Sequence, residues 1–306
     1  MMPRRSGSQL PLLRTLSFVL TLGLAVVNAT AAALVFQTDF GLKDGAVSAM
    51  KGVAFGVDPN LRQFDLTHEI PAYNVWEAAF RLKQTVPYWP TGTVFVNVVD
   101  PGVGTERRAV VARTRDNHYI VTPDNGSLTF LAESPGLSEV RLIDTAKQRL
   151  KGSEESYTFH GRDLFAYVGA RLATGKLEFR DCGVRLTNDV VRLSYAKPHR
   201  SGDTLIGSIP VLDVQYGNVW SNLPKRLFQE LKPVVGESFQ VRIAQGGRKV
   251  WEGRVPFGET FGAVPAGQPI LYVNSLLEVA LALNQGNFAT ANHVASGPDW
   301  TFEISR

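Results

Sequence analysis

The segment from Thr93 to Arg108, TVFVNVVDPGVGTERR, constrains the fold of this chain more than any other. Its first half is apolar except for Asn97 and predicts a buried β-strand that runs into Asp100. A proline and two glycines follow, so the backbone turns sharply there and can approach a ligand closely. Open α/β sheets bind ligands beside the carboxyl ends of their strands. The segment therefore predicts an α/β fold with a reactive carboxylate at the sheet edge; a strand-to-turn corner with a capping Asp is the alternative.

The rest of the pattern divides the chain at residues 194–203. Before that segment, predicted strands alternate with helices, and beyond it short strands are interrupted by frequent Gly and Pro. We expect a Rossmann-like α/β domain with a central sheet at residues 32–197 and a smaller C-terminal β-barrel or sandwich at residues 203–306. The predicted N-terminal strands are 34–38, 63–65, 94–99, 109–113, 119–122 and 140–142, the predicted helices 74–86 and 164–174, and the predicted C-terminal strands include 204–212, 238–243, 249–255 and 270–273.

Residues 1–31 are predicted to be a signal peptide. Arg4, Arg5 and Arg14 give a positive start, residues 16–27 are apolar, and Ala29-Thr30-Ala31 is a small-x-small cleavage site. The apolar stretch is too short for a comfortable membrane span. We therefore expect an exported, periplasmic protein with no stable membrane span after cleavage; an uncleaved anchor is the alternative.

Composition excludes several classes of partner and cofactor. Removing the leader, which holds three arginines and no acidic residue, lowers the formal net charge of the 306-residue chain from +4 to +1. With no run of basic residues, nucleic acid is not an expected partner. Cys182 is the only cysteine, so no intrachain disulfide can form. Five histidines and one cysteine give no credible metal set, and we expect no metal.

An ordered set of motifs accompanies the Asp100 turn. The motifs are LVFQTDFGLKDGAVSAMKG (34–52), FDLTHEI (64–70), VTPDNGSLTFL (121–131), YTFHGRDLFA (157–166), DVQYGNVWSN (213–222) and YVNSLLEVALALNQGN (272–287). Over residues 35–287 the chain resembles the S-adenosyl-L-methionine hydroxide adenosyltransferase family, which shares its fold with fluorinating and chlorinating enzymes. The resemblance implies hydrolysis of S-adenosyl-L-methionine to adenosine and L-methionine, no cofactor besides this adenosyl substrate, and a homotrimer or a multiple of one.

The resemblance implies that Asp100, Arg107 and His160 activate water. A carboxylate held ionised by a guanidinium can orient an imidazole or accept a proton from water. Arg108 is the alternative to Arg107, and a structural histidine that caps the following helix is the alternative role for His160. His68, at the end of a predicted strand, is interpreted as a structural residue.

The resemblance also implies the substrate contacts. Asp39 matches a carboxylate that bridges the two ribose hydroxyls, since its two acceptor oxygens suit a vicinal diol. Asp44 matches a residue near the methionine end, although it also suits the N-cap of the next helix.

Further contacts lie in the C-terminal part. Asp213 and Asn218 match the acid and amide that hold the methionine ammonium and the adenine edge, with a plain β-turn around Gly217 as the alternative. Candidate walls of the adenine slot are Tyr216, Phe261 and Trp220, which core packing would equally explain. Ser275 matches the serine that receives the methionine carboxylate.

Departures from the relatives bear on the nucleophile. Asp100 stands where the fluorinating relatives have an aromatic residue, and Val103 where they have a small hydroxyl residue. Desolvating a halide beside a fixed carboxylate is unfavourable, so water is the expected nucleophile. Leu276, Leu277 and Ala46 also depart from the family pattern around the amino-acid socket. Two alternative functions stay open: an exported nucleoside-binding protein without turnover, and halide-dependent synthesis of a 5′-halo-adenosine.

Overall fold

The structure is a computed structural model that describes Met1, residues 32–187 and residues 190–306. Apart from Met1, the predicted signal peptide lies outside the described residues. Within the described ranges, no helix is long and apolar enough to cross a membrane.

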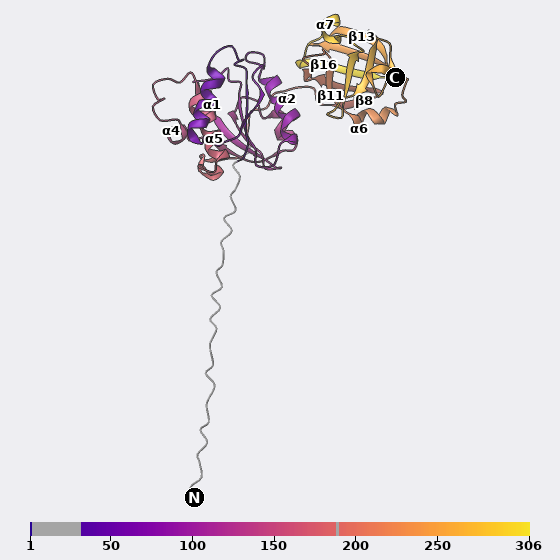
Figure 1. The fold of residues 1–306 in the computed structure, drawn as a ribbon. Coiled ribbons are helices and arrows are strands. Elements are labelled where there is room, and N and C mark those ends of the chain that lie inside the picture. Colours follow the sequence, from indigo (N-terminus) through magenta and orange to yellow (C-terminus); the bar gives the residue numbers. More distant parts are fainter. Residues whose placement is uncertain (2–31, 188–189) are drawn as a thin grey trace. The chain divides into compact units, whose positions relative to one another are not determined.

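A seven-stranded mixed sheet forms the N-terminal half of the fold (Figure 1). Its order is β2-β1-β3-β5-β4-β6-β7; the first four strands run parallel and the last three join by antiparallel pairing. The strands are β1 (Leu34–Thr38), β2 (Gln63–Thr67), β3 (Val94–Val98), β4 (Ala109–Thr114), β5 (Tyr119–Pro123), β6 (Leu137–Leu142) and β7 (Arg185–Leu186). The helices are α1 (Ala46–Val57), α2 (Val75–Thr85), α3 (Thr129–Glu133), α4 (Thr145–Gln148) and α5 (Tyr167–Ala173), with shorter helical turns at η1 (Val86–Tyr88), η2 (Gly161–Ala166) and η3 (Phe179–Asp181).

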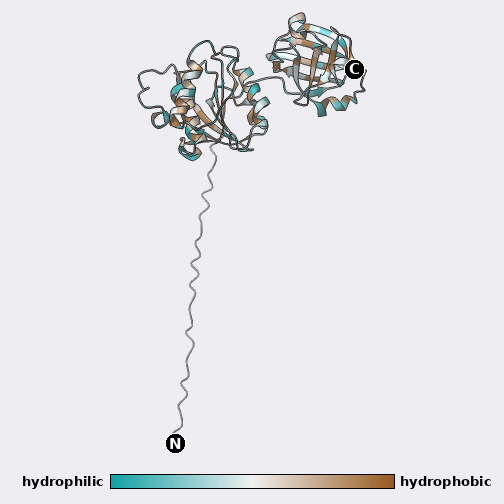
Figure 2. Cartoon of the chain, in the orientation of Figure 1, coloured by the Kyte–Doolittle hydropathy of each residue, from teal (hydrophilic) through white to brown (hydrophobic). Residues whose placement is uncertain are grey.

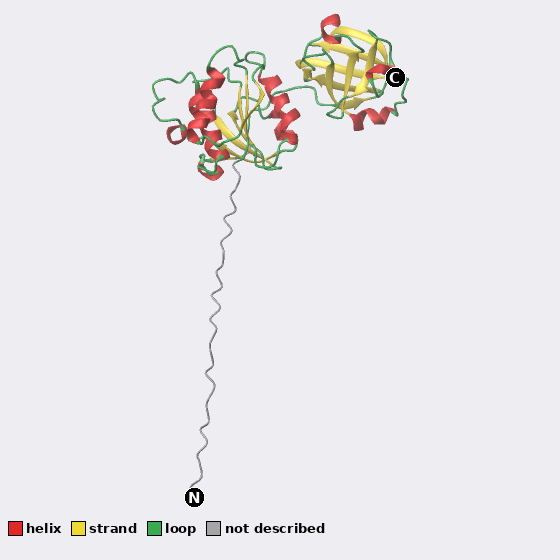
Figure 3. Cartoon of the chain, viewed as in Figure 1, coloured by secondary structure: helices red, strands yellow, loops and turns green. Residues whose placement is uncertain are grey.

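Both faces of this sheet are covered by helices, as Figures 1 and 3 show. Alternate side chains of β1 point to opposite faces: Leu34 packs with Met50 of α1 and Val168 of α5, whereas Val35 packs with Leu82 of α2. Because both faces are buried, β1 and β3 begin with runs of three apolar residues rather than an alternating pattern, and polar residues appear only toward their carboxyl ends. Hydrophobic residues therefore concentrate in the strands, as Figure 2 shows.

Two helices differ from their predicted bounds in instructive ways. Asn74 is the N-cap of α2 and accepts a hydrogen bond from the Glu77 amide at 3.0 Å, so the predicted helix 74–86 is almost the observed one. The predicted helix 164–174 instead starts earlier, with the π-helical turn η2 before α5. Asp163 is fully buried in that turn and pairs with Arg162. Because a charged residue occupies a buried position there, the spacing of apolar residues did not reveal the start of the helix.

Two antiparallel sheets form the C-terminal half. Their orders are β10-β11-β15-β14 and β13-β12-β16-β9-β8, and side chains from both sheets share one core. The elements are β8 (His199–Ser201), β9 (Thr204–Ile209), β10 (Val211–Leu212), β11 (Val219–Pro224), α6 (Lys225–Phe228), η4 (Gln229–Leu231), β12 (Ser238–Gln245), β13 (Arg248–Pro256), η5 (Phe261–Ala263), β14 (Pro269–Val273), β15 (Glu278–Leu283), α7 (Phe288–Asn292) and β16 (Gly297–Ser305).

The prediction of a single strand over residues 204–212 is wrong. The chain divides at Pro210 into β9 and β10, which belong to different sheets. Proline has no amide hydrogen for the ladder and fixes its own φ, so a strand ends readily there.

Two helical glycines provide a test of the helix-on-sheet packing. A Cβ on Gly169 of α5 would lie 2.3 Å from Val96 Cγ2 of β3, whereas Gly52 of α1 has no atom within 4 Å of that position. We expect Gly169→Ala to lower the free energy of unfolding by about 1–3 kcal/mol through overpacking. Gly52→Ala, the matched control, is expected to raise it by about 0.4–1 kcal/mol. Urea unfolding measures both, and a Gly169→Ala protein as stable as the parent would contradict this packing.

Candidate active site

A cavity of about 300 Å³ lies where the order of the parallel strands reverses. The chain passes from β1 to β2 on one side and then to β3 on the other, which makes β1 and β3 the switch point where α/β sheets bind ligands. Asp39 follows β1 directly and Asp100 follows β3 after one residue. Both carboxylates line the cavity, together with Tyr73 and His160.

The guanidinium of Arg107 contacts both Asp100 and His160. Arg107 Nε lies 2.9 Å from Asp100 Oδ1 and 3.0 Å from Oδ2, and Nη2 also donates to Oδ2. The same Nη2 lies 3.0 Å from His160 Nδ1. The Asp100 and Arg107 side chains are only 5% and 11% exposed, so water screens their attraction weakly.

The two adjacent arginines have different partners. Arg107 reaches Asp100, whereas Arg108 Nη2 lies 2.5 Å from Oδ2 of the buried Asp124. Gly102 lies under the Arg107 side chain, where a Cβ would come within 3.1 Å of Arg107 Cγ. The glycine-rich turn thus gives Arg107 the room to fold back onto Asp100.

His160 lies at the start of η2, but its side chain makes no capping hydrogen bond to that turn. Burial lowers the pKa of His160, and the positive charges of Arg107 and Arg149 lower it further, while Asp100 and Asp163 act in the opposite direction. Since an unperturbed histidine has a pKa of about 6.5, this imidazole is neutral at pH 7.

Asp39 is held by the backbone of Tyr73. The Tyr73 amide donates to Asp39 Oδ2 at 2.8 Å, and Tyr73 adopts the left-handed conformation with φ of 67°. This conformation is uncommon for a residue with a side chain, and it points to a constrained functional turn. Asp44 is exposed and accepts from the Ala46 amide at 2.9 Å; it does not line the cavity, and Gly45 is the N-cap of α1.

His68 has a buried, bridging position next to that turn. Its Nδ1 lies 2.8 Å from Thr38 Oγ1, and its Nε2 lies 2.9 Å from Asp65 Oδ1. Thr38 directly precedes Asp39, so this chain of contacts supports the turn that carries the carboxylate.

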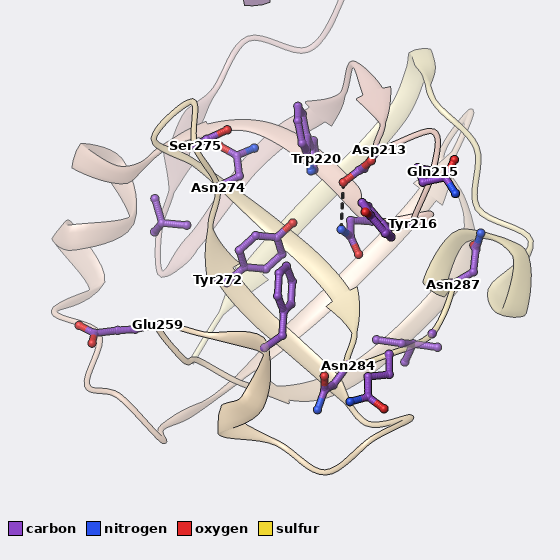
Figure 4. A pocket seen from close by; sticks show the side chains of 16 residues that line it. Asp213, Gln215, Tyr216, Trp220, Glu259, Tyr272, Asn274, Ser275, Asn284 and Asn287 are labelled. Carbon is purple, nitrogen blue, oxygen red and sulfur yellow. Dashed lines mark hydrogen bonds between the residues drawn. The ribbon is translucent and has the colours of Figure 1, made fainter.

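A second cavity, of about 710 Å³, lies in the C-terminal half (Figure 4). Its lining includes every C-terminal candidate from the sequence: Asp213, Tyr216, Asn218, Trp220, Phe261 and Ser275. Tyr216 and Phe261 are 64% and 44% exposed, which is unusual for large rings that serve only as core.

Asp213 and Asn218 occupy one tight turn and face this cavity. The Asp213 amide donates to Asn218 O at 2.9 Å, and Asn218 Nδ2 donates to Asp213 Oδ2 at 3.2 Å, the dashed line in Figure 4. Gly217 has φ of 66°, and a Cβ there would lie 1.9 Å from Asn287 Oδ1. The β-turn and the paired polar groups are therefore one feature rather than two alternatives.

Tyr73 and Asn274 are among the lining residues that the sequence analysis did not identify. Asn274 is 6% exposed, and its Oδ1 accepts from the Leu276 and Glu278 amides at 2.9 and 3.1 Å. Its Nδ2 has no hydrogen-bond partner among the described residues. The only signal for Asn274 was its place beside Ser275, and for Tyr73 its place just before the N-cap Asn74.

Within the described residues, no group of three or more His, Cys, Asp and Glu side chains is arranged to hold a metal ion.

Comparisons with known proteins give a consistent result. The model of the SAM hydroxide adenosyltransferase N-terminal domain matches residues 34–183, and that of the C-terminal domain matches residues 207–301. A relative from Salinispora tropica named (R)-S-adenosyl-L-methionine hydrolase is 36% identical over 272 residues, covering 86% of this chain and 94% of the relative. A fluorinase from an Actinoplanes species is 28% identical over 289 residues, covering 86% of this chain and 95% of the fluorinase.

Among solved structures, that of an uncharacterized conserved protein from Thermotoga maritima superimposes with a TM-score of 0.82. It is 35% identical, and the match covers 89% of this chain and 100% of that protein. The matched models and relatives extend through both halves of the fold and both cavities, so this chain belongs to the SAM hydroxide adenosyltransferase family.

Proposed function

We propose that this protein hydrolyses S-adenosyl-L-methionine, with water displacing L-methionine from the ribose C5′ to leave adenosine. The observation that carries this proposal is the Arg107 guanidinium, which contacts both the Asp100 carboxylate and a neutral His160, two side chains that line one cavity. The sulfonium is an excellent leaving group, so the enzyme has to orient water and remove its proton. A carboxylate and an imidazole fixed by a shared guanidinium supply that chemistry.

Asp39 is proposed to bind the ribose. It lines the same cavity as Asp100, and the Tyr73 amide fixes one of its oxygens. A carboxylate accepts several hydrogen bonds at once, so the 2′ and 3′ hydroxyls can both donate to Asp39. The C5′ atom would then lie on the Asp100 side of the sugar.

The second cavity is proposed to take the adenine and the amino-acid head. Tyr216 and Phe261 offer flat apolar surface for the base, and the Asp213 carboxylate suits the ammonium. The Ser275 hydroxyl and the unpartnered, buried Asn274 Nδ2 are donors suited to the methionine carboxylate. A buried donor without a partner is costly until a ligand satisfies it, which supports a polar ligand at this end.

The residues at the reaction cavity favour water over halide. Asp100 places a negative charge beside the position of the nucleophile. This charge repels a halide anion, whereas a water molecule can donate a hydrogen bond to it. Val103, which also lines this cavity, offers no hydroxyl to bind a halide. A binding protein without turnover would have no use for the Asp100–Arg107–His160 arrangement.

We further propose that the site is completed by a neighbouring subunit of a homotrimer. The two cavities of the chain share no lining residue, yet one adenosyl substrate needs both sets. A head-to-tail contact between the Asp39 and Asp100 cavity of one subunit and the Asp213 cavity of the next closes into a ring. The family resemblance, which implies a homotrimer, supports this assembly.

The finer architecture and the cellular context are proposals as well. Parallel strands β2-β1-β3-β5 with helices on both faces support a Rossmann-like domain at residues 32–197, and two antiparallel sheets around one core support a sandwich or barrel at residues 203–306. The sequence of residues 1–31 supports a cleaved signal peptide and a periplasmic enzyme. Direct displacement of a sulfonium by water supports catalysis without a metal or cofactor.

Incubation with S-adenosyl-L-methionine followed by chromatography tests the reaction. We expect adenosine and L-methionine in equal amounts, and we expect Asp100→Asn to lower kcat by about 10²–10⁴-fold with little change in KM, because only the transition state needs the base. Asp203→Asn, at a carboxylate with a 95% exposed side chain, is the control. Binding without product, or a halogenated nucleoside when halide is added, would replace this function with one of its alternatives.

Calorimetry with adenosine tests the ribose contact. Asp39→Ala is expected to weaken adenosine binding, since each charge-assisted hydrogen bond that it loses contributes about 1.5–3 kcal/mol. Asp44→Ala is expected to leave adenosine affinity unchanged because Asp44 does not line the cavity. Asp44→Ala also distinguishes a contact with the methionine end from a purely structural role at the start of α1. Weaker binding of S-adenosyl-L-methionine by this variant would place Asp44 at the methionine end. Unchanged adenosine affinity in a folded Asp39→Ala protein would exclude the ribose contact.

Mixing inactive subunits tests the shared site. Asp100→Asn and Asn218→Ala subunits change different cavities, so co-refolded mixed rings should contain some interfaces with both halves intact and regain part of the activity. Each variant refolded alone is the control. A parent protein that is fully active as a monomer would rule the assembly out.

A further inference from the structure

The contact between Arg107 and His160 determines which imidazole nitrogen carries the proton. A guanidinium has five N–H donors and no acceptor, and it stays charged throughout the pH range of proteins. Arg107 Nη2 lies 3.0 Å from His160 Nδ1, so Nδ1 has to accept and therefore carries no hydrogen. A neutral imidazole has one N–H, which leaves the proton of His160 on Nε2.

The surroundings of the ring keep it in this neutral form. The charged groups that face it are Asp100 after β3, Arg107 before β4, Arg149 in the loop that leads to His160, and Asp163 in η2. Protonation would place an Nδ1–H against the guanidinium, where two like charges would meet at hydrogen-bond distance. Burial and the two arginines accordingly lower the pKa of His160.

Arg149 is itself fixed, so its charge stays near the ring. Its guanidinium donates to Ser153 Oγ at 2.9 Å and to Ser153 O at 2.7 Å, and lies 3.6 Å from Oδ2 of the buried Asp163. It also covers the ring of Tyr157, which packs edge-on to His160 with the ring centroids 6.4 Å apart.

We propose that His160 acts as a neutral hydrogen-bond donor, whose Nε2–H orients the attacking water, and that Asp100 rather than His160 receives the proton of that water. This assignment rests on the proposed hydrolysis. A histidine general base would need a free lone pair on Nε2, and that tautomer would direct Nδ1–H at the Arg107 guanidinium. The sequence leaves open whether Asp100 orients the imidazole or itself accepts the proton of water. The Arg107–His160 contact favours Asp100 as the proton acceptor.

The step balances with these residues alone. The water oxygen forms a bond to C5′ as the C5′–S bond breaks, and the bonding electron pair returns to sulfur, which becomes the neutral thioether of methionine. The attacking water grows strongly acidic as it bonds to carbon, so a carboxylate is a sufficient base. Asp100 Oδ2 accepts from both Nε and Nη2 of Arg107, whereas Oδ1 accepts only from Nε and keeps a second lone pair for the proton. The proton then passes from Asp100 to solvent.

Two amide variants distinguish a donor from a base. The amide nitrogen of glutamine corresponds to the imidazole Nε2 and that of asparagine to Nδ1, and neither amide is a base. If His160 is a donor, H160Q keeps kcat within about tenfold of the parent, while H160N loses about 10²-fold or more. A loss of about 10²–10⁴-fold in both variants, or in neither, would overturn the assignment. Urea unfolding of each variant provides the control for folding.

The tautomer can also be measured without turnover. In a ¹⁵N-labelled protein, protonated and unprotonated ring nitrogens have well-separated chemical shifts, and the signals of His160 among the five histidines are those missing from H160Q. We expect a protonated Nε2 and an unprotonated Nδ1 at neutral pH in the protein without substrate. A protonated Nδ1 would contradict the tautomer. If the tautomer is found but no adenosine is released from the substrate, the hydrolysis proposal fails instead.

Discussion

The guanidinium of Arg107 is the contact on which the proposed chemistry depends. It joins side chains from three places in the chain: Asp100 after β3, its own position before β4, and His160 at the start of η2. None of these three residues lies in a strand, so the pairing of the sheet does not fix the distances between them. The charge-assisted bonds to Arg107 do so, and burial keeps water from weakening them.

The sheet topology brings the second carboxylate to the same place. Thr38 at the end of β1 pairs with Val98 at the end of β3, so the two parallel strands end level with each other. Asp39 and Asp100 are then adjacent in space although 61 positions separate them in sequence. Any insertion in β1 or β3 would shift this register and move one carboxylate off the cavity.

The strand before Asp100 could be predicted from the sequence because a strand buried on both faces is apolar at successive positions, here at every position of β3 except Asn97. The arginine that binds Asp100 could not be predicted, because Arg107 and Arg108 are neighbours. Only the path of the turn decides that Arg107 reaches Asp100 and Arg108 reaches Asp124. Tyr73 was missed since its left-handed φ leaves no mark on residue type, and Asn274 since a buried amide resembles any turn residue. The strand break at Pro210 had a visible signal, which the apolar run around it outweighed.

The charges at the reaction cavity also explain why a neutral histidine suits this reaction. Asp39 and Asp100 contribute two negative charges and Arg107 one positive charge, so the cavity carries a net negative charge when His160 is neutral. The sulfonium substrate balances it. As methionine leaves, the positive charge on sulfur disappears and the proton on Asp100 replaces it, so the net charge of the cavity and its contents is unchanged by the reaction.

A protonated His160 would add a positive charge beside a cationic substrate, which weakens binding and pulls electron density from the attacking water. Arg107, which also binds Asp100, opposes protonation of His160 because its Nη2 donates to Nδ1.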